Sequence, residues 1–407
     1  MNCRNCSAPL EHTFLDLGFA PPSNAYLNEA DLKKPEVYYP LKLKVCVYCW
    51  LVQTEDYAGA DELFTADYAY FSSTSTSWLD HARRYAEEVT KRLGLGASSL
   101  VIEIASNDGY LLRNFVAAGI PCLGIEPTAS TAAAAERIGV PVLREFFSAA
   151  LGQKLATEGR RADLIVGNNV YAHVPDINDF TAGMKRVLKP GGTLTLEFPH
   201  VMRLIENTQF DTVYHEHFSY LSLHTVSRIF LQAGLRIFDV EEIPTHGGSV
   251  RVFGCHADEL RTVSSAVAIV VEEEERHGLR KLETYKAFQP RADRIKNDML
   301  AFLIEQKRQG KSVVAYGAAA KGSTLLNYAG IRADLLACAY DAAPSKQGKF
   351  MPGSHIPIVD QSRLRRDRPD YVVILPWNLR QEVMAQLAYI REWGGRFVTA
   401  IPRMEVA

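Results

Sequence analysis

The 407-residue sequence has almost no net charge, because 45 lysines and arginines face 47 aspartates and glutamates, giving −2. Without a basic excess, the chain lacks the electrostatic field that draws proteins to nucleic acid or to anionic membranes. Long apolar runs are also missing: Ala266–Val271, among the longest, falls far short of the ~20 residues of a membrane-spanning helix. The opening Met1-Asn2-Cys3-Arg4 contains no apolar signal core. We therefore expect a cytoplasmic protein with no nucleic-acid or membrane partner.

Cysteines are few, and their spacing is not that of a disulfide framework. Four of the seven form two Cys-x-x-Cys pairs, Cys3 with Cys6 and Cys46 with Cys49. A two-residue gap lets both thiolates of a pair face one ion, and two pairs complete a tetrahedral shell. Residues 1–72 have little helical periodicity and too little apolar surface to fold without such a staple. We expect a zinc-binding domain here, with structural zinc; a redox pair beside chance cysteines is the alternative.

Beyond residue 72, apolar strands alternate with amphipathic helices, and Ser77 is expected to start the first helix. Strands are expected at Leu100–Ile104, Pro121–Ile125, Leu164–Val166 and Leu194–Phe198. Such alternation predicts an α/β fold with a doubly wound, Rossmann-like parallel sheet, here over residues 73–285. Connecting helices and a second alternating set predict a smaller C-terminal α/β domain over residues 286–407.

The first strand-to-helix turn lacks the glycines of a dinucleotide site. Glu103-Ile104-Ala105-Ser106-Asn107-Asp108-Gly109 has one glycine where that fingerprint has three, and there is no Gly-Lys-Ser/Thr phosphate loop. Glu126, at the end of the next strand, can bind ribose hydroxyls. A strand-end acid without a pyrophosphate cradle suits S-adenosylmethionine, whose ammonium and sulfonium groups favour nearby carboxylates. An ordinary strand-to-helix turn with no ligand is the alternative.

A third strand carries further polar residues to the same edge of the sheet. The segment Asp163–Asp176 brings Asn168, Asn169 and His173 there. With the turn Leu188-Lys189-Pro190-Gly191-Gly192, the pattern over residues ~77–255 resembles the class I S-adenosylmethionine-dependent methyltransferase core. We expect the cofactor to be bound by Glu103, Ala105, Ser106, Asn107, Gly109, Glu126, Pro127, Asn168 and Asn169.

Further motifs extend this resemblance along nearly the whole chain. They are Tyr68–Ser73, Tyr214-His215-Glu216-His217-Phe218-Ser219-Tyr220, Thr245–Arg251 and Tyr316–Gly322. Together with the cysteine pairs, they resemble the three-domain sugar C-methyltransferase family. The resemblance implies S-adenosylmethionine-dependent methylation of carbon 3 of a nucleotide-linked 4-keto-deoxysugar. In that family such sugars are made for antibiotics and surface glycans, and thymidine diphosphate is the expected nucleotide. The C-terminal domain would contribute to sugar-nucleotide binding.

Methylation at carbon needs a base, because carbon is a poor nucleophile until a proton leaves. We expect His217 to be that base, since an imidazole titrates near working pH. Tyr214 suits oxyanion stabilisation, and Glu216 would orient His217 or bind a sugar hydroxyl. By resemblance, His173 and Tyr70 would also enter the site. Lys321, beside Tyr316 and Gly317, either holds the diphosphate or serves domain packing. Roles are left open for His215, His246, Glu197 and His200.

The sequence also allows several other interpretations. A metal bound by His215 and His217 lacks a recognisable third ligand. A nicotinamide-dependent sugar-nucleotide oxidoreductase is disfavoured by the missing glycines, and a non-catalytic zinc-stapled binding protein by the retained acids and histidines. Methylation at oxygen or nitrogen requires only a base near a heteroatom, so the sequence leaves it open.

Overall fold

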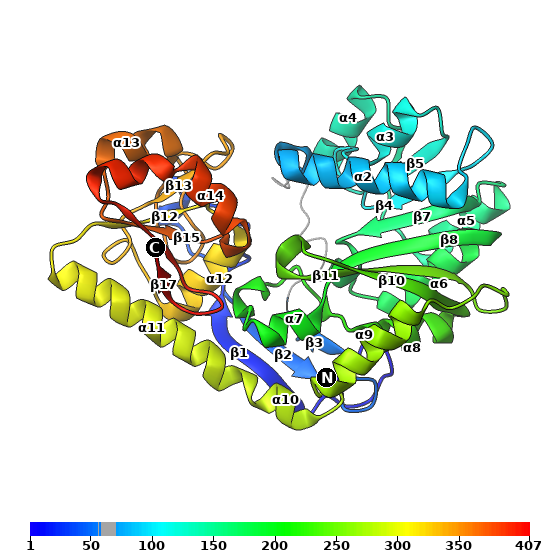
Figure 1. Ribbon diagram of the computed structural model, residues 1–407, viewed down its shortest axis with the longest axis horizontal. Coiled ribbons are helices and arrows are strands. Elements are labelled where there is room, and N and C mark those ends of the chain that lie inside the picture. Colours follow the sequence, from blue (N-terminus) through cyan, green and yellow to red (C-terminus); the bar gives the residue numbers. More distant parts are fainter. Residues whose placement is uncertain (56, 58–70) are drawn as a thin grey trace.

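The structure is a computed structural model that describes residues 1–55, 57 and 71–407. Three sheets of four, seven and six strands organise the described chain. Figure 1 shows the seven-stranded and six-stranded sheets on opposite sides of the molecule, with the N-terminal strands beneath and between them. None of the helices in the described ranges has the length and apolar character to cross a lipid bilayer.

The N-terminal sheet is completed by a strand from the middle of the chain. It has the order β1 (His12–Ala20), β2 (Tyr39–Val45), β3 (Val52–Thr54) and β9 (Ser219–Tyr220), with antiparallel neighbours throughout. In the last pair Val52 lies opposite Tyr220 and Gln53 opposite Ser219. The segment that follows His217 is therefore hydrogen-bonded into the sheet that carries the cysteine pairs.

The seven-stranded sheet has the order β10-β11-β8-β7-β4-β5-β6. Its first five strands in the chain are mutually parallel: β4 (Val101–Ile104), β5 (Cys122–Ile125), β6 (Val142–Leu143), β7 (Ala162–Asn168) and β8 (Leu188–Pro199). The hairpin of β10 (Leu235–Ile243) and β11 (Ser249–His256) adds antiparallel strands to one edge. The strand order reverses between β4 and β7, and loops diverging at such a reversal leave a crevice at the carboxyl edge.

Helices cover both faces of this sheet and bury two separate apolar clusters. One face carries α2 (Thr76–Leu93), α3 (Leu112–Ala117) and α4 (Ala129–Arg137), and the other α5 (Ala149–Thr157), α6 (Ile177–Val187) and α8 (Leu223–Ala233). The doubly wound α/β core expected from the sequence is confirmed. The expected start of α2 was wrong, because Ser75 is its N-cap and accepts a hydrogen bond from the Trp78 backbone N–H. Ser77 already lies inside the helix.

Connecting helices lead to the C-terminal sheet. They are α9 (Ser265–Arg276), α10 (Leu282–Lys286) and the long α11 (Phe288–Arg308), which runs beneath the C-terminal unit (Figure 1). The sheet order is β14 (Ile358–Asp360), β13 (Ala339–Asp341), β12 (Val313–Tyr316), β15 (Tyr371–Ile374), β16 (Arg396–Thr399) and β17 (Glu405–Val406). Only the β16–β17 pair is antiparallel. The flanking helices are α12 (Ala320–Ala329), α13 (Leu364–Asp367) and α14 (Arg380–Gln386). The smaller C-terminal α/β unit is thus confirmed.

One apolar core joins the N-terminal and C-terminal sheets. It contains Phe14 and Leu15 of β1, Phe288 of α11, and Ala315 and Leu325 of the C-terminal unit. Because these residues are almost completely buried together, the two sheets pack as one body.

Candidate functional site

The four paired cysteines come together in one cluster. Their sulfur atoms all lie within 4.8 Å of one another, and the Cys3–Cys49 and Cys6–Cys46 sulfur pairs are each 3.5 Å apart. Tetrahedral zinc with bonds of about 2.3 Å requires sulfur separations of about 3.8 Å. The donor set and its dimensions therefore fit a zinc ion.

Both cysteine pairs form the same kind of turn. Ser7 N–H donates to the Cys3 carbonyl at 2.9 Å, and Trp50 N–H to the Cys46 carbonyl at 2.8 Å. Ser7 and Trp50 each have a left-handed backbone, with φ of 61° and 62°. Gln53 Nε2 also donates to Cys3 Sγ at 3.2 Å. The hydrogen bond with Cys49 lowers the pKa of Cys3 to about 4. A thiolate is the form that binds a metal.

A cavity of about 760 Å³ lies at the carboxyl edge of the central sheet and reaches α12 of the C-terminal unit. Its size is typical of a small-molecule site, for which ~300–1,000 Å³ is usual. Of the residues predicted to bind a cofactor, those on the cavity wall are Ala105, Asn107, Glu126, Pro127, Asn168 and Asn169. Of the predicted catalytic residues, the described wall includes His173, Tyr214 and His217 but not Glu216.

Backbone hydrogen bonds fix the acidic group beside the first turn. The Glu126 carboxylate accepts hydrogen bonds from the N–H groups of Asn107 at 3.0 Å and Thr128 at 2.9 Å. Asn107 Oδ1 in turn accepts from Ser72 N–H at 3.0 Å. Asn107 and Ala105 both have left-handed backbones, with φ of 49° and 57°. The turn after β4 is thereby held open toward the cavity.

Two side-chain amides lie buried on the cavity wall after β7. Neither oxygen nor nitrogen of the Asn168 and Asn169 amides has a hydrogen-bond partner within residues 1–55, 57 and 71–407. An unpaired buried polar group costs ~1–3 kcal/mol. A polar ligand would recover that cost, so these amides fit a cofactor rich in polar groups, as S-adenosylmethionine is.

Glu103, Ser106 and Gly109 are not on the described wall of the cavity. Glu103 is buried, and burial, followed by repulsion from Asp108 and Glu126, raises the pKa of its carboxyl well above its usual range. A Cβ on Gly109, where φ is +78°, would lie 3.1 Å from the side chains of helix α4 and of the loop after it. These residues shape the turn from behind. Direct contact between them and a cofactor stays a prediction.

Two histidines from different loops meet on the cavity wall. His173 ends the turn Tyr171–His173, and the centroid of its ring lies 4.6 Å from that of His217. Burial lowers the pKa of His173 to about 4, and burial together with His173 holds the pKa of His217 well below its usual range. His217 Nδ1 lies 3.1 Å from the Thr212 carbonyl oxygen, which can only accept. Nδ1 therefore carries the hydrogen, and Nε2 of the neutral ring keeps a lone pair.

The neighbours of His217 face different surroundings. The Tyr214 ring lies on the cavity wall, 4.0 Å from the His217 ring between centroids. The Glu216 carboxylate accepts hydrogen bonds from Ser23 Oγ at 3.3 Å and Asn24 Nδ2 at 3.2 Å, and burial raises its pKa. Glu216 thus joins the segment to the N-terminal unit.

His215 packs its ring against Tyr39, with centroids 5.9 Å apart, and is not on the described wall of the cavity. Tyr70 lies outside the described residues.

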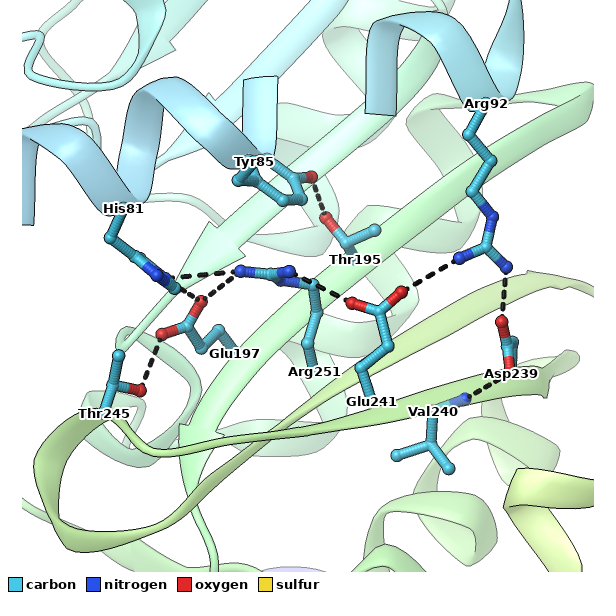
Figure 2. A network of polar contacts seen from close by, with 10 residues as sticks. All are labelled: His81, Tyr85, Arg92, Thr195, Glu197, Asp239, Val240, Glu241, Thr245 and Arg251. Carbon is cyan, nitrogen blue, oxygen red and sulfur yellow. Dashed lines mark hydrogen bonds and ion pairs between the residues drawn. The ribbon is translucent and has the colours of Figure 1, made fainter. Parts of the chain in front are cut away.

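An ionic network with Glu197 and Arg251 at its buried centre lies beneath α2 (Figure 2). The Glu197 carboxylate, at the end of β8, lies 3.0 Å from His81 Nε2 and accepts hydrogen bonds from Arg251 at 3.0 Å and Thr245 Oγ1 at 3.1 Å. Although burial alone would raise it, His81 and Arg251 hold the pKa of Glu197 below its usual value. Arg251 continues the network to Glu241 at 3.1 Å. Glu197 therefore connects α2, the β10–β11 hairpin and the loop between its strands.

That hairpin loop presents His246 to the cavity. His246 has a left-handed backbone with φ of 54°, and its ring centroid lies 5.4 Å from that of Trp78 on α2. Burial lowers its pKa to about 4. Since Thr245, one residue earlier, is bound to Glu197, the network positions His246 without itself reaching the cavity.

Two partly buried lysines lie on the C-terminal side of the cavity. Lys321 Nζ donates to Asn378 Oδ1 at 2.8 Å and lies 4.7 Å from the centre of the Trp377 ring. Burial lowers its pKa to about 8, against the opposing effect of Asp211. Lys346 Nζ donates to the Ala318 carbonyl at 2.8 Å, and burial lowers its pKa also. Helix α12 begins beside them with no side-chain cap on its N–H groups. Two cations at a helix N-terminus suit phosphate groups.

Several residues of the cavity wall carry no functional signal in the sequence. Lys346 follows β13 in a segment with no motif, and Trp78 has the spacing of an ordinary helical core residue. Asn24 follows two prolines, a turn signal that carries no chemistry. Tyr316 and Gly317, which the sequence placed with Lys321, are absent from the described wall; Tyr316 donates to Gln361 instead.

Comparisons with known proteins agree with this arrangement. Residues 3–64 match a family model described as "Putative zinc binding domain", residues 78–240 a methyltransferase domain, and residues 244–402 a C-methyltransferase C-terminal domain. C-methyltransferase NovU of Streptomyces niveus is 34% identical over 404 residues, which cover 99% of this chain and 96% of NovU.

Other similar proteins match only part of the chain. An uncharacterized methyltransferase of Mycobacterium leprae is 31% identical over 99 residues, 24% of this chain and 36% of that one. A crystal structure of the glycopeptide N-methyltransferase MtfA with S-adenosylmethionine aligns with a TM-score of 0.34 and 17% identity, over 43% of this chain and 94% of MtfA. On the three family models and the full-length likeness to NovU, the chain belongs to the S-adenosylmethionine-dependent C-methyltransferases with this three-part architecture.

Proposed function

We propose that the protein methylates carbon 3 of a nucleotide-linked 4-keto-deoxysugar, with thymidine diphosphate as the nucleotide. The observation that carries the proposal is the shared cavity wall: the neutral His173–His217 pair lies on the same cavity as Lys321 and Lys346. A base and two cations on one cavity wall match a substrate that has both an acidic carbon and a diphosphate.

S-adenosylmethionine, when bound, supplies a sulfonium methyl group, an electrophile that a carbanion can attack. The residues that would hold it are those on the cavity wall at the sheet edge. Glu126, fixed by two backbone N–H groups, would accept hydrogen bonds from ribose hydroxyls, and the amides of Asn168 and Asn169 would find polar partners. Glu103, Ser106 and Gly109 would support the turn after β4 that carries Ala105 and Asn107 near the ligand, and Pro127 would approach it from the end of β5.

His217 takes the proton from carbon 3. The carbonyl at carbon 4 makes that C–H bond acidic, because the electron pair it leaves is delocalised as an enolate. The Nδ1–H bond to the Thr212 carbonyl holds the ring in the tautomer whose Nε2 accepts the proton. Tyr214 donates its O–H to the enolate oxygen. Carbon 3 would then form its new bond to the methyl group while the bond between sulfur and that methyl group breaks, so that the bonding electron pair stays on sulfur as a neutral thioether. The imidazolium loses the proton to water.

Substrate charge would strengthen the base. Lys321 is one of the groups that lower the pKa of His217, after burial, His173 and His246. A diphosphate beside Lys321 would offset that positive charge and so raise the basicity of His217. In this scheme the imidazole is most basic when the sugar nucleotide occupies the cavity.

The remaining parts of the chain have supporting roles in the proposal. Cys3, Cys6, Cys46 and Cys49 bind structural zinc in an N-terminal unit of residues 1–72. Residues 73–285 hold the cofactor, and residues 286–407 contribute Lys321 and Lys346 to the sugar nucleotide. Tyr70 would enter the site, as the resemblance implies.

The test is incubation with a thymidine-diphosphate 4-keto-deoxysugar and methyl-labelled cofactor. We expect one labelled methyl group on carbon 3 and, in heavy water without cofactor, exchange of the carbon 3 proton. His217→Asn keeps a donor for the Thr212 carbonyl but removes Nε2, so both reactions should fall by ~10²–10⁴. Cofactor affinity should stay near normal.

His215→Asn is the matched control, since that ring packs against Tyr39 outside the cavity. Full activity in His217→Asn would place the base elsewhere. Methyl transfer without exchange at carbon 3 would indicate methylation at oxygen or nitrogen instead.

A further inference from the structure

Arg4 lies inside the first cysteine knuckle, between Cys3 and Cys6, and its side chain reaches the central unit at Pro175. One guanidinium nitrogen, Nη1, donates to the Pro175 carbonyl at 2.8 Å, and the other, Nη2, donates to the Thr54 carbonyl at 3.2 Å. The guanidinium carbon also lies 5.4 Å from the centre of the Phe218 ring. A single arginine therefore contacts the loop after His173, the end of β3 and the ring that follows His217.

The groups that Arg4 contacts stand beside the two histidines of the cavity. Pro175 is two residues beyond His173, and Phe218 directly follows His217. Thr54 N–H donates to the Phe218 carbonyl at 3.1 Å, which ties the Arg4 contact on β3 to the same loop. The guanidinium thus connects the backbones of both histidine loops from outside the cavity.

The backbone of Arg4 is itself fixed on two sides. Arg4 N–H donates to Gln53 Oε1 at 2.9 Å, and Gln53 Nε2 donates to Cys3 Sγ at 3.2 Å. Asn178, at the start of α6, donates to the carbonyls of Arg4 at 3.3 Å and Asn5 at 2.8 Å. The position of the guanidinium consequently depends on the knuckle, which the four cysteines close.

We propose that Arg4 is a positioning residue that transmits the geometry of the four-cysteine site to the His173–His217 pair. The proposal rests on the proposed function, in which His217 is the base. The ring centroids of His173 and His217 lie 4.6 Å apart, so a shift of the His173 loop changes the surroundings of His217. The cysteine cluster then serves the proton transfer as well as the stability of the N-terminal unit.

The test compares Arg4→Met with Arg228→Met. Arg228, on α8, donates to the Tyr48 carbonyl of the second knuckle at 2.8 Å, so its removal costs a bond of the same kind at the other cysteine pair. In Arg4→Met we expect kcat to fall about 10- to 100-fold, because small misplacements of reacting groups cost that much. The KM values of cofactor and sugar nucleotide should stay within about twofold, and zinc content should match that of Arg228→Met by elemental analysis.

A second measurement is independent of turnover. Titration of ¹⁵N-histidine-labelled protein by NMR reports the protonation of His217, identified by its absence from the His217→Asn spectrum. Arg4→Met should shift the His217 titration upward toward that of an ordinary histidine, whereas Arg228→Met should leave it in place. This comparison decides the positioning role even if no sugar nucleotide proves to be a substrate.

A conservative variant covers the case in which Arg4→Met loses zinc. Arg4→Lys keeps the charge, but one ammonium cannot reach both carbonyls as the two guanidinium nitrogens do. We expect it to keep zinc and to show a smaller loss of kcat and a smaller shift of His217. If zinc-loaded Arg4→Lys equals the wild type, or Arg4→Met equals Arg228→Met, in both kcat and the His217 titration, the proposal is overturned.

Discussion

Removing the positive charge of Lys321 should weaken the binding of the sugar nucleotide. It should also abolish the pH dependence of that binding. The partly buried Lys321 side chain lies on the cavity wall, and its ammonium group has Asn378 and the Trp377 ring as neighbours. A hydrogen bond to a charged group contributes ~1.5–3 kcal/mol. Lys321→Met should therefore raise the dissociation constant of a thymidine-diphosphate sugar about 10- to 150-fold at pH 7.

The pH dependence follows from the same side chain. Burial lowers the pKa of Lys321 to about 8, so the group is cationic at pH 7 and mostly neutral at pH 9. If the cationic form binds the diphosphate, wild-type affinity should weaken about tenfold between these pH values. The diester phosphates of a nucleotide sugar do not titrate in this range. Lys321→Met should show weak, constant affinity, and Lys321→Arg should bind tightly at both pH values because an arginine stays charged.

Isothermal titration calorimetry of the sugar nucleotide at pH 7, 8 and 9 measures these differences. Cofactor binding to the same variants is the internal control, since the residues proposed for it lie at the sheet edge. The proposed role of the Lys321 charge is refuted if wild-type affinity for the sugar nucleotide is constant across this range. It is also refuted if that affinity changes with pH in Lys321→Met as it does in the wild type. In either case the charge of Lys321 does not reach the diphosphate.

Three further outcomes are expected. Cys46→Ser should release zinc and lower the melting temperature, while Cys338→Ser should do neither; unchanged metal content by elemental analysis would contradict the four-cysteine site. Glu197→Ala should cost ~3–5 kcal/mol in chemical denaturation, because it removes the buried carboxylate that pairs with the buried Arg251 guanidinium. An effect as small as that of an exposed ion pair would contradict the network. The rate of carbon 3 exchange should fall only on acidification below pH 6.5, because His217 must be neutral and its pKa is depressed; an acid limb above pH 7 would exclude this group as the base.

Much of the fold could be predicted because its strands carry strong local signals. β4, β5 and β7 are continuous apolar runs followed by polar turns, the pattern of strands buried on both faces. By contrast, β9, β14 and β17 have two or three residues each and no apolar run. Such strands exist only because a partner strand from a distant part of the chain offers them hydrogen bonds, and no local pattern records that partner.

Site residues could be predicted where a motif places them at the carboxyl edge of the central sheet. They could not be predicted where the direction of the side chain decides whether it reaches the cavity. Asn168 and Asn169 follow a buried strand, so their arrival at the cavity follows from the strand's end. Glu103 and Ile104 are neighbours on one strand and point to opposite sides, and only Ile104 is on the described cavity wall. The contacts of Glu216 with Ser23 and Asn24 join segments almost two hundred residues apart, which a single sequence does not reveal.

The pairing of β9 with β3 has a consequence for building chimeras from members of this family. The N-terminal segment cannot be exchanged on its own, because it pairs with both of the other units. Its sheet includes Ser219 and Tyr220 of the central unit, and Leu27 pairs with Phe350 of the C-terminal unit. A chimera joined near residue 72 would pair the N-terminal segment of one protein with strands of both other units from a different protein. Such chimeras should fold only when the segments around positions 219–220 and 350 come from the same parent protein as the N-terminal segment.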